Sequence, residues 1–367
     1  MIEIWRFVSA IMILFCHLYY VGVEGDYPFS ATWIFVEFFF ILTGFLTARH
    51  FWVRLKKINA QSASGEPEAL CNASQKLSFK QLWREFGLFM HSKVVHFLPL
   101  TTLAILIQYV LEYAYRRNEP GFSAGKFWGE LPMDLIYISD FFEEPKDVPL
   151  WYISAILWTF PIIFLILWIP RRNLRMVISL IIPIGFYLYA GVENHRHFPW
   201  DYLRSLSGML IGIFVFDVVV IIRKYCSNKE IYTKQSKLSM VLLSALEFLT
   251  LLIPIVTVGL SIQNQAGNLV CFAIGVVLIG SNLTVSQNLS GQVLDYLGRL
   301  SIHIFIWQWV VGTAVWCLDR VVGYFVTGGL PLTARVLIYI FGTVITAVTA
   351  DFVYIKLRLS ALFTLRK

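Results

Sequence analysis

The first apolar segment of the chain carries two ionisable side chains, Arg6 and His17, eleven positions apart. In a helix both would lie on one face, about 16 Å apart along the axis. An ionisable group at membrane depth costs roughly several kcal/mol unless it faces a polar interior. We therefore predict that both groups open onto one hydrated tunnel, where an imidazole could exchange a proton near neutral pH. The alternative is that Arg6 lies at headgroup level and His17 is a hydrogen-bonded core residue.

The second apolar segment adds a carboxylate, Glu37, and a small polar pair, Thr43 and Gly44. Glu37 and His17 both fall in the outer halves of their predicted helices. A Glu–His pair would orient the imidazole and stabilise its protonated form. The alternative for Glu37 is a structural buried hydrogen bond. Gly44 permits close approach of a ligand or a neighbouring helix, and helix packing is the favoured interpretation.

Basic residues open two later apolar segments. Lys93 and His96 precede Pro99, which we expect to start a helix at the cytosolic edge of the membrane. Arg299 opens a further segment from the same side. Together with Arg6, these side chains could form a mouth for an anionic donor. Ordinary anchoring of cytosolic basic residues is the alternative.

An aromatic cluster, Trp151, Tyr152 and Trp158, opens another apolar segment together with Ser154. Aromatic residues are common where a helix meets the membrane surface. This cluster is denser than such a belt requires, and stacked aromatic rings also form sugar-binding surfaces. We therefore consider it a candidate surface for an acceptor.

The composition is that of a polytopic membrane protein. Of the 367 residues, 57% are hydrophobic and 14% are charged, whereas a soluble domain has about 25% charged residues. The net charge of +7 is interpreted as membrane topology and not as affinity for nucleic acid. The five cysteines have no paired spacing, and His195 and His197 lack a third ligand, so we predict no disulfide framework and no metal site.

Ten segments are apolar enough to span a bilayer, which takes about 20 residues. They cover residues 2–22, 32–51, 95–114, 149–169, 174–191, 203–222, 238–261, 269–286, 300–318 and 333–355. Most Lys and Arg residues become cytosolic if the N-terminus is cytosolic, which predicts both termini inside. We therefore expect one all-α transmembrane domain over residues 1–367. Residues 52–92 form its cytosolic loop, with a short amphipathic helix around Phe79–Met90. Residues 131–142 are apolar but too short to span.

Four motifs follow one another along the chain. They are Arg6-x10-His17, Phe38-Phe-Phe-Ile-Leu-Thr43-Gly44-Phe-Leu, Leu150-Trp151-Tyr152-Ile-Ser154-Ala and Leu297-Gly298-Arg299-Leu-Ser301. Together they resemble the acyltransferase-3 family of membrane acyltransferases, which includes O-acetyltransferases of cell-surface polysaccharides. Two positions depart from that family. Lys93-x-x-His96 stands where the family has Arg-x-x-Arg, and Gln308 stands where it often has His.

The resemblance implies that the protein moves an acetyl group from acetyl-CoA to a hydroxyl of a cell-surface polysaccharide or lipid-linked glycan. From the residues themselves, we predict a catalytic set of His17, Arg6 and Glu37: His17 is the general base or the acyl carrier, Glu37 orients it, and Arg6 holds the donor at the cytosolic face. The implied donor-binding and acceptor-binding sets are, respectively, Lys93, His96, Arg299 and Ser301, and Trp151, Tyr152, Ser154 and Thr43.

A competing interpretation is a transporter or flippase that moves a glycan or small solute without chemistry. The absence of an internal repeat argues against a transporter built from symmetric halves. A small-molecule sensor is a third interpretation, which the Arg6–His17 stripe disfavours. The expected location is the plasma or inner membrane. The sequence does not specify the acceptor, the acyl group, the position acylated, the side on which transfer ends or the oligomeric state.

Overall fold

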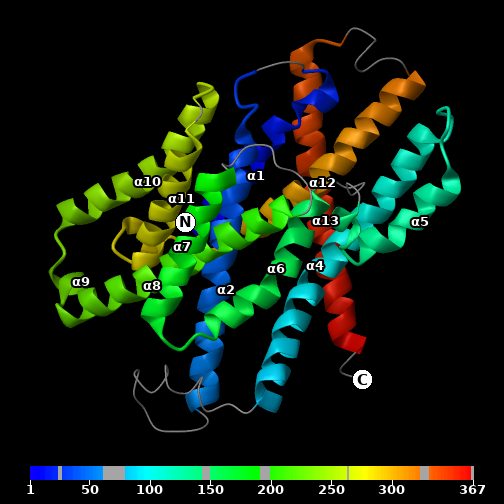
Figure 1. The fold of residues 1–367 in the computed structure, drawn as a ribbon. Coiled ribbons are helices and arrows are strands. Elements are labelled where there is room, and N and C mark those ends of the chain that lie inside the picture. Colours follow the sequence, from blue (N-terminus) through cyan, green and yellow to red (C-terminus); the bar gives the residue numbers. More distant parts are fainter. Residues whose placement is uncertain are drawn as a thin grey trace.

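A computed structural model describes residues 1–23, 27–60, 79–142, 149–190, 199–262, 264–322 and 330–364. These residues form a bundle of helices with no strand among them (Figure 1). The main helices are α1 (Ile2–Cys16), α2 (Phe35–Ala60), α4 (Phe79–Arg116), α5 (Ala124–Leu135), α6 (Leu150–Leu167), α7 (Arg172–Ala190), α8 (Trp200–Asn228), α9 (Ile231–Lys234), α10 (Lys237–Gly259), α11 (Gln265–Ser281), α12 (Gln292–Val322) and α13 (Leu332–Thr364). Short 3-10 turns are η1 (Leu18–Val21), η2 (Thr32–Ile34), η4 (Ser139–Phe141) and η5 (Val285–Asn288).

Seven helical stretches in the described residues are long and apolar enough to cross a membrane, which confirms the all-α polytopic bundle. They are Thr32–Leu55, Lys80–Arg116, Leu150–Leu167, Trp200–Asn228, Lys237–Gly259, Gln292–Leu318 and Leu332–Lys356. The other three predicted spans correspond to α1, α7 and α11. The first and last have 15 and 17 residues, and α7 carries two arginines in its first turn. The predicted windows 2–22 and 269–286 continue past the ends of α1 and α11 into the residues that follow, so they overestimated the apolar length of these two helices.

The third predicted span is wrong in its boundaries. The structure has one continuous helix, α4, where the sequence predicted an amphipathic helix and a separate span beginning near Pro99. Pro99 lies inside this helix. A proline removes one backbone donor from a helix, and neighbouring polar groups can compensate for this loss in a membrane helix. The bond lost at Pro99 is the one to the carbonyl of Val95; the hydroxyls of Thr101 and Thr102 add hydrogen bonds one turn further on, to the carbonyls of Phe97 and Leu98 at 3.1 and 2.7 Å.

The centre of the bundle is the close contact between α2 and α8 (Figure 1). A Cβ atom on Gly44 would lie 2.0 Å from the carbonyl oxygen of Met209, and one on Gly212 would lie 2.1 Å from that of Ile41. Only glycine permits the two backbones to approach so closely, as in other small-residue helix contacts. The packing interpretation of Gly44 is confirmed.

The described residues form two apolar cores. The larger core contains buried side chains from α2, α6 and α8, such as Phe40, Phe160 and Met209. The smaller core joins α1, α12 and α13 through side chains such as Leu14 and Ile304. Side chains of α1, α2, α6 and α12 all belong to the larger core, so these four helices are packed against one another.

Candidate functional site

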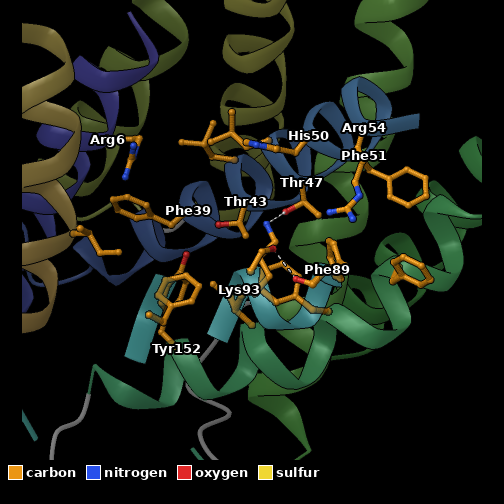
Figure 2. A pocket seen from close by; sticks show the side chains of 18 of the residues that line it. Arg6, Phe39, Thr43, Thr47, His50, Phe51, Arg54, Phe89, Lys93 and Tyr152 are labelled. Carbon is orange, nitrogen blue, oxygen red and sulfur yellow. Dashed lines mark hydrogen bonds between the residues drawn. The ribbon is translucent and has the colours of Figure 1, made fainter. Parts of the chain in front are cut away.

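A large cavity of about 440 Å³ lies between α1, α2, α4, α6 and α12 (Figure 2). One part of its wall is apolar and aromatic, with Phe51, Phe89, Phe160, Phe164 and Trp168. The polar wall is formed by Arg6, Thr43, Thr47, His50, Arg54, Glu85, Ser92, Lys93 and Tyr152. Four of the polar side chains carry or can carry a positive charge, against one carboxylate. This large cavity therefore suits an anionic molecule that also has an apolar part.

Lys93 provides a cation with little internal compensation. Its Nζ atom donates to Thr47 Oγ1 at 3.3 Å and lies 4.8 Å from the ring centre of Phe160 and 5.4 Å from that of Phe89 (Figure 2). Within the described part of the chain, no carboxylate lies within ion-pair distance of this ammonium group. A cation held only by a hydroxyl and two aromatic rings retains donors for a bound anion.

Arg6 is held in place by its own helix. Its Nη1 atom donates to Glu3 Oε2 at 2.8 Å. A Cβ atom on Gly298 of α12 would lie 1.6 Å from the same carboxylate oxygen. Gly298 therefore leaves room for Glu3, which in turn orients Arg6 toward the large cavity. This contact gives a structural reason for the glycine in the Leu297–Ser301 motif.

A small cavity of about 220 Å³ contains His17. The ring atom His17 Nδ1 lies 3.2 Å from Gln308 Oε1, and the ring meets Trp309 edge-on with centres 5.5 Å apart. The wall also contains Cys16, Tyr19, Ser30, Trp33, Trp151 and Arg204. An imidazole beside several aromatic faces can take up a proton and can border a sugar-sized ligand.

The position of His17 at the end of α1 is fixed by a tyrosine from the following loop. The Tyr27 hydroxyl donates to the carbonyl of Phe15 at 2.8 Å. Burial raises the pKa of Tyr27 to about 12, so the hydroxyl remains protonated and keeps this hydrogen bond.

The two cavities follow one another along the same helices. On α1, Arg6 borders the large cavity and His17 the small one. On α6, Trp151 borders the small cavity, whereas Tyr152 and residues later in the helix border the large one. Helix α2 repeats this order, with Val36 at the small cavity and later residues at the large one. The cavities are therefore stacked along the bundle.

Three aromatic rings separate the cavities. Phe305 borders both, and its ring centre lies 5.1 Å from that of Tyr152 and 6.2 Å from that of Phe39. Phe39 and Tyr152 are 6.5 Å apart. We call these three side chains the ring layer. The prediction of one continuous tunnel from Arg6 to His17 is wrong, because side chains from three other helices close the path.

Glu37 does not pair with His17. Its Oε1 atom accepts hydrogen bonds from Arg204 Nε and Nη2 at 3.0 and 2.7 Å, and its Oε2 atom accepts one from the Tyr187 hydroxyl at 2.8 Å. The carboxylate is fully buried. The predicted pair is therefore wrong, because the Glu37 side chain faces Tyr187 on α7 and Arg204 on α8.

Arg299 and Ser301 also face away from the large cavity. Arg299 Nε lies 3.5 Å from Asp351 Oδ1 on α13. The buried Ser301 hydroxyl donates to the carbonyl of Gly298 at 2.7 Å. Neither residue borders either cavity. The helical rotation of α12 instead directs Phe305 and Gln308 toward the cavities, so the predicted donor contacts from Arg299 and Ser301 are not supported by this geometry.

The Ser154 side chain makes a hydrogen bond inside the bundle and is not available to a ligand in either cavity. Its hydroxyl donates to the carbonyl of Tyr137 at 2.7 Å, and it borders neither cavity. Of the other predicted acceptor-binding residues, Trp151 borders the small cavity with His17, whereas Tyr152 and Thr43 border the large cavity. The side chain of His96 lies outside the described parts of the structure.

Several cavity residues received no role from the sequence. Thr47, His50 and Arg54 continue the α2 face that begins at Thr43, with spacings of four, three and four residues. This spacing is the signal that could have identified them. Gln308 and Arg204 have no such local signal, because their partners lie on other helices.

The chain matches over residues 2–354 the family described as an acyltransferase domain. Together with its long apolar helices, this match defines the protein as a multi-pass membrane acyltransferase. The chain belongs to the acyltransferase-3 family, as its four motifs indicated. No match to this chain was found among curated proteins or among solved structures.

Proposed function

We propose that this protein is an O-acetyltransferase of the cell membrane that moves an acetyl group from acetyl-CoA to a hydroxyl of a cell-surface polysaccharide or lipid-linked glycan. The observation that carries this proposal is the stacking of two unlike cavities. One is cationic, the other contains an imidazole among aromatic rings, and a single ring layer lies between them. Such an arrangement suits two substrates that enter separately and meet at one point.

The large cavity is the proposed donor site. Lys93 and Arg6 would contact the negative or carbonyl groups of acetyl-CoA, because cationic donors form the stronger hydrogen bonds to anions. The apolar wall around Phe160 would receive the uncharged part of the donor. Basic residues are frequent near the C-terminal end of α2, which borders the large cavity. This supports an opening of the large cavity to the cytosol, where acetyl-CoA is available.

The small cavity is the proposed acceptor site. Trp151 and Trp309 offer aromatic faces to a sugar ring, and His17 lies beside them. The Arg204 guanidinium lies 5.3 Å from the ring centre of Trp151 and supports that ring from behind while it is paired with Glu37. A neutral hydroxyl acceptor suits this cavity because the Arg204 charge is already compensated.

The proposed reaction uses His17 as a general base. Its unprotonated nitrogen takes the proton of the acceptor hydroxyl while the oxygen attacks the thioester carbonyl carbon. The carbon–sulfur bond then breaks, and the CoA thiolate takes the proton from the imidazolium. In the alternative route the same nitrogen attacks the thioester carbonyl carbon and the CoA thiolate leaves; the acceptor oxygen then takes the acetyl group from the imidazole, and the hydroxyl proton passes to the thiolate. In both routes the acetyl end of the donor must pass the ring layer.

Acetyl-CoA labelled in its acetyl group provides the decisive test of the proposed function. The purified full-length protein is expected to release CoA thiol and to transfer label to an added surface glycan. A transporter without chemistry would release no thiol and would move the glycan across a vesicle membrane. Absence of both thiol release and label transfer, with glycan transport present, would contradict the proposal.

Replacement of Lys93 by methionine is expected to raise the KM for acetyl-CoA by about tenfold or more, because a hydrogen bond to a charged group contributes about 1.5–3 kcal/mol. The kcat should change much less, since Lys93 is distant from His17 in the stacked arrangement. Lys80→Met provides the control, because Lys80 is exposed near the start of α4. An unchanged KM in Lys93→Met would remove this residue from the donor site.

Replacement of Phe305 by alanine is expected to join the two cavities. Water would then reach the bound thioester more easily, so the ratio of acetyl-CoA hydrolysis to acetyl transfer should rise several-fold. Phe305→Leu keeps most of the side-chain volume and should leave this ratio closer to that of the natural protein. Equal ratios in all three proteins would show that the ring layer does not separate the substrates.

A further inference from the structure

Gln308 contacts the imidazole of His17 directly, and both side chains border the small cavity. It lies on α12 and is fully buried. Its amide nitrogen, Nε2, donates to the carbonyl oxygen of Phe305 at 3.0 Å, and its amide oxygen, Oε1, lies 3.2 Å from His17 Nδ1. Both ends of the amide therefore have a partner, one in its own helix and one in α1.

The two contacts determine the direction of the amide. A carbonyl oxygen can only accept a hydrogen bond, so the side-chain nitrogen of Gln308 must face Phe305. The amide oxygen then faces His17 and can only accept, which requires a proton on Nδ1 of the imidazole. In the neutral ring the lone pair is consequently on Nε2.

We propose that Gln308 is a positioning residue that holds His17 in the Nδ1-protonated form and fixes its ring plane, so that Nε2 carries the lone pair used for acetyl transfer. This inference rests on the proposed function, and it applies equally to the base and the carrier routes. The ring of Trp309 is nearly perpendicular to the imidazole, at 86°, and limits rotation of the imidazole from a second side. Phe305 thus has two effects: its ring divides the cavities and its carbonyl orients Gln308.

The electrostatic surroundings of His17 make the contact with Gln308 testable by pH. The titratable or charged side chains that border the small cavity with it are Cys16, Tyr19 and Arg204. Arg204 is compensated by Glu37, and the cysteine thiol lies 3.5 Å from His17 Nδ1. None of the three is a carboxylate. A carboxylate introduced at position 308 would therefore be a new negative neighbour of the imidazole.

The test compares Gln308→Glu with Gln308→Met. Both variants lose the amide donor to Phe305, but only glutamate keeps an acceptor for His17 Nδ1. We expect Gln308→Met to lower kcat at least tenfold with little change in the KM for acetyl-CoA. Gln308→Glu should retain more activity than Gln308→Met. The acidic limb of the pH–activity profile of Gln308→Glu should move to higher pH, because a carboxylate stabilises the protonated imidazole.

A structural role alone would affect both variants alike and would leave the shape of the pH profile unchanged, and that outcome would overturn the inference. A second readout does not depend on activity. The ¹⁵N spectra of histidine-labelled protein, with His17→Ala to assign the signal, should report Nδ1 protonation in the natural protein and a mixture in Gln308→Met. A ¹⁵N signal that shows the proton of neutral His17 on Nε2 in the natural protein would also overturn the inference.

The two levels of the hypothesis are separable. If the natural protein transfers no acetyl group, the proposed function fails and the ¹⁵N result still tests the contact between Gln308 and His17. If the natural protein is active, His17→Ala is inactive and Gln308→Met is fully active, only the positioning role fails. Thermal unfolding of each purified variant in detergent verifies that the comparison is made between folded proteins.

Discussion

Replacement of His17 by alanine is expected to reduce acetyl transfer by about 10²–10⁴-fold, the usual contribution of a general acid or base. The loss should appear in kcat, since the large cavity contains no atom of His17 and donor binding should persist. The measurement is transfer of labelled acetyl at saturating acetyl-CoA and acceptor. Added imidazole should restore part of the activity, because the vacated volume adjoins a cavity of about 220 Å³.

A histidine outside both cavities provides the matched control. His91 is exposed on α4, and His91→Ala should transfer acetyl groups at the natural rate. Equal membrane levels and equal melting temperatures of the two variants would show that the fold is intact. Transfer by His17→Ala within twofold of the natural protein would exclude both routes proposed for this residue, and the reaction would then need a different base.

Local sequence patterns were sufficient for the parts of the site that depend on one helix. Thr43, Trp151 and Tyr152 were selected from short motifs, and each borders a cavity. Arg6 and His17 were selected because an ionisable group within an apolar segment requires a polar neighbourhood. Each of these inferences concerns which face of one helix is polar, and helical periodicity contains that information.

Contacts between distant helices could not be predicted in the same way. Glu37 was paired with His17 on the basis of similar depth, but its partner Arg204 is 167 residues away along the chain. Depth alone does not determine which neighbour a side chain faces. For Arg299 the neighbour is Asp351 of α13, a helix that the sequence motif did not include.

The ring layer illustrates a second limit of the sequence. Phe39, Tyr152 and Phe305 come from three helices, and although Tyr152 belongs to a predicted aromatic cluster, no local pattern indicates that the three rings meet. Whether a polar stripe forms one tunnel or two cavities depends on where such rings meet. This property follows from side-chain packing between helices and has no signature in the spacing of charged residues.

The contact between Glu37 and Arg204 leads to the second large effect, which concerns stability. Loss of one member of a buried ion pair typically destabilises a protein by about 3–5 kcal/mol, because the remaining charge is left uncompensated. Glu37→Gln also weakens the acceptor for Tyr187. We therefore expect Glu37→Gln and Arg204→Met to lower the melting temperature in detergent strongly and to reduce the amount of protein in the membrane. Asp295→Asn, at an exposed carboxylate in the first turn of α12, is the control and should change the melting temperature little.

The double variant Glu37→Leu with Arg204→Met decides between a structural and a catalytic role for the carboxylate. Apolar side chains of similar size often replace a buried ion pair without loss of stability. The double variant should therefore be more stable than either single variant, although Asp201, 3.5 Å from Arg204, then loses one neighbour. Recovered stability together with recovered acetyl transfer would establish Glu37 as a structural residue that holds α2 against α8. Recovered stability with transfer still absent would mean that one of the two charged groups acts at the site, either the carboxylate, as in the predicted pair with His17, or Arg204, which borders the small cavity.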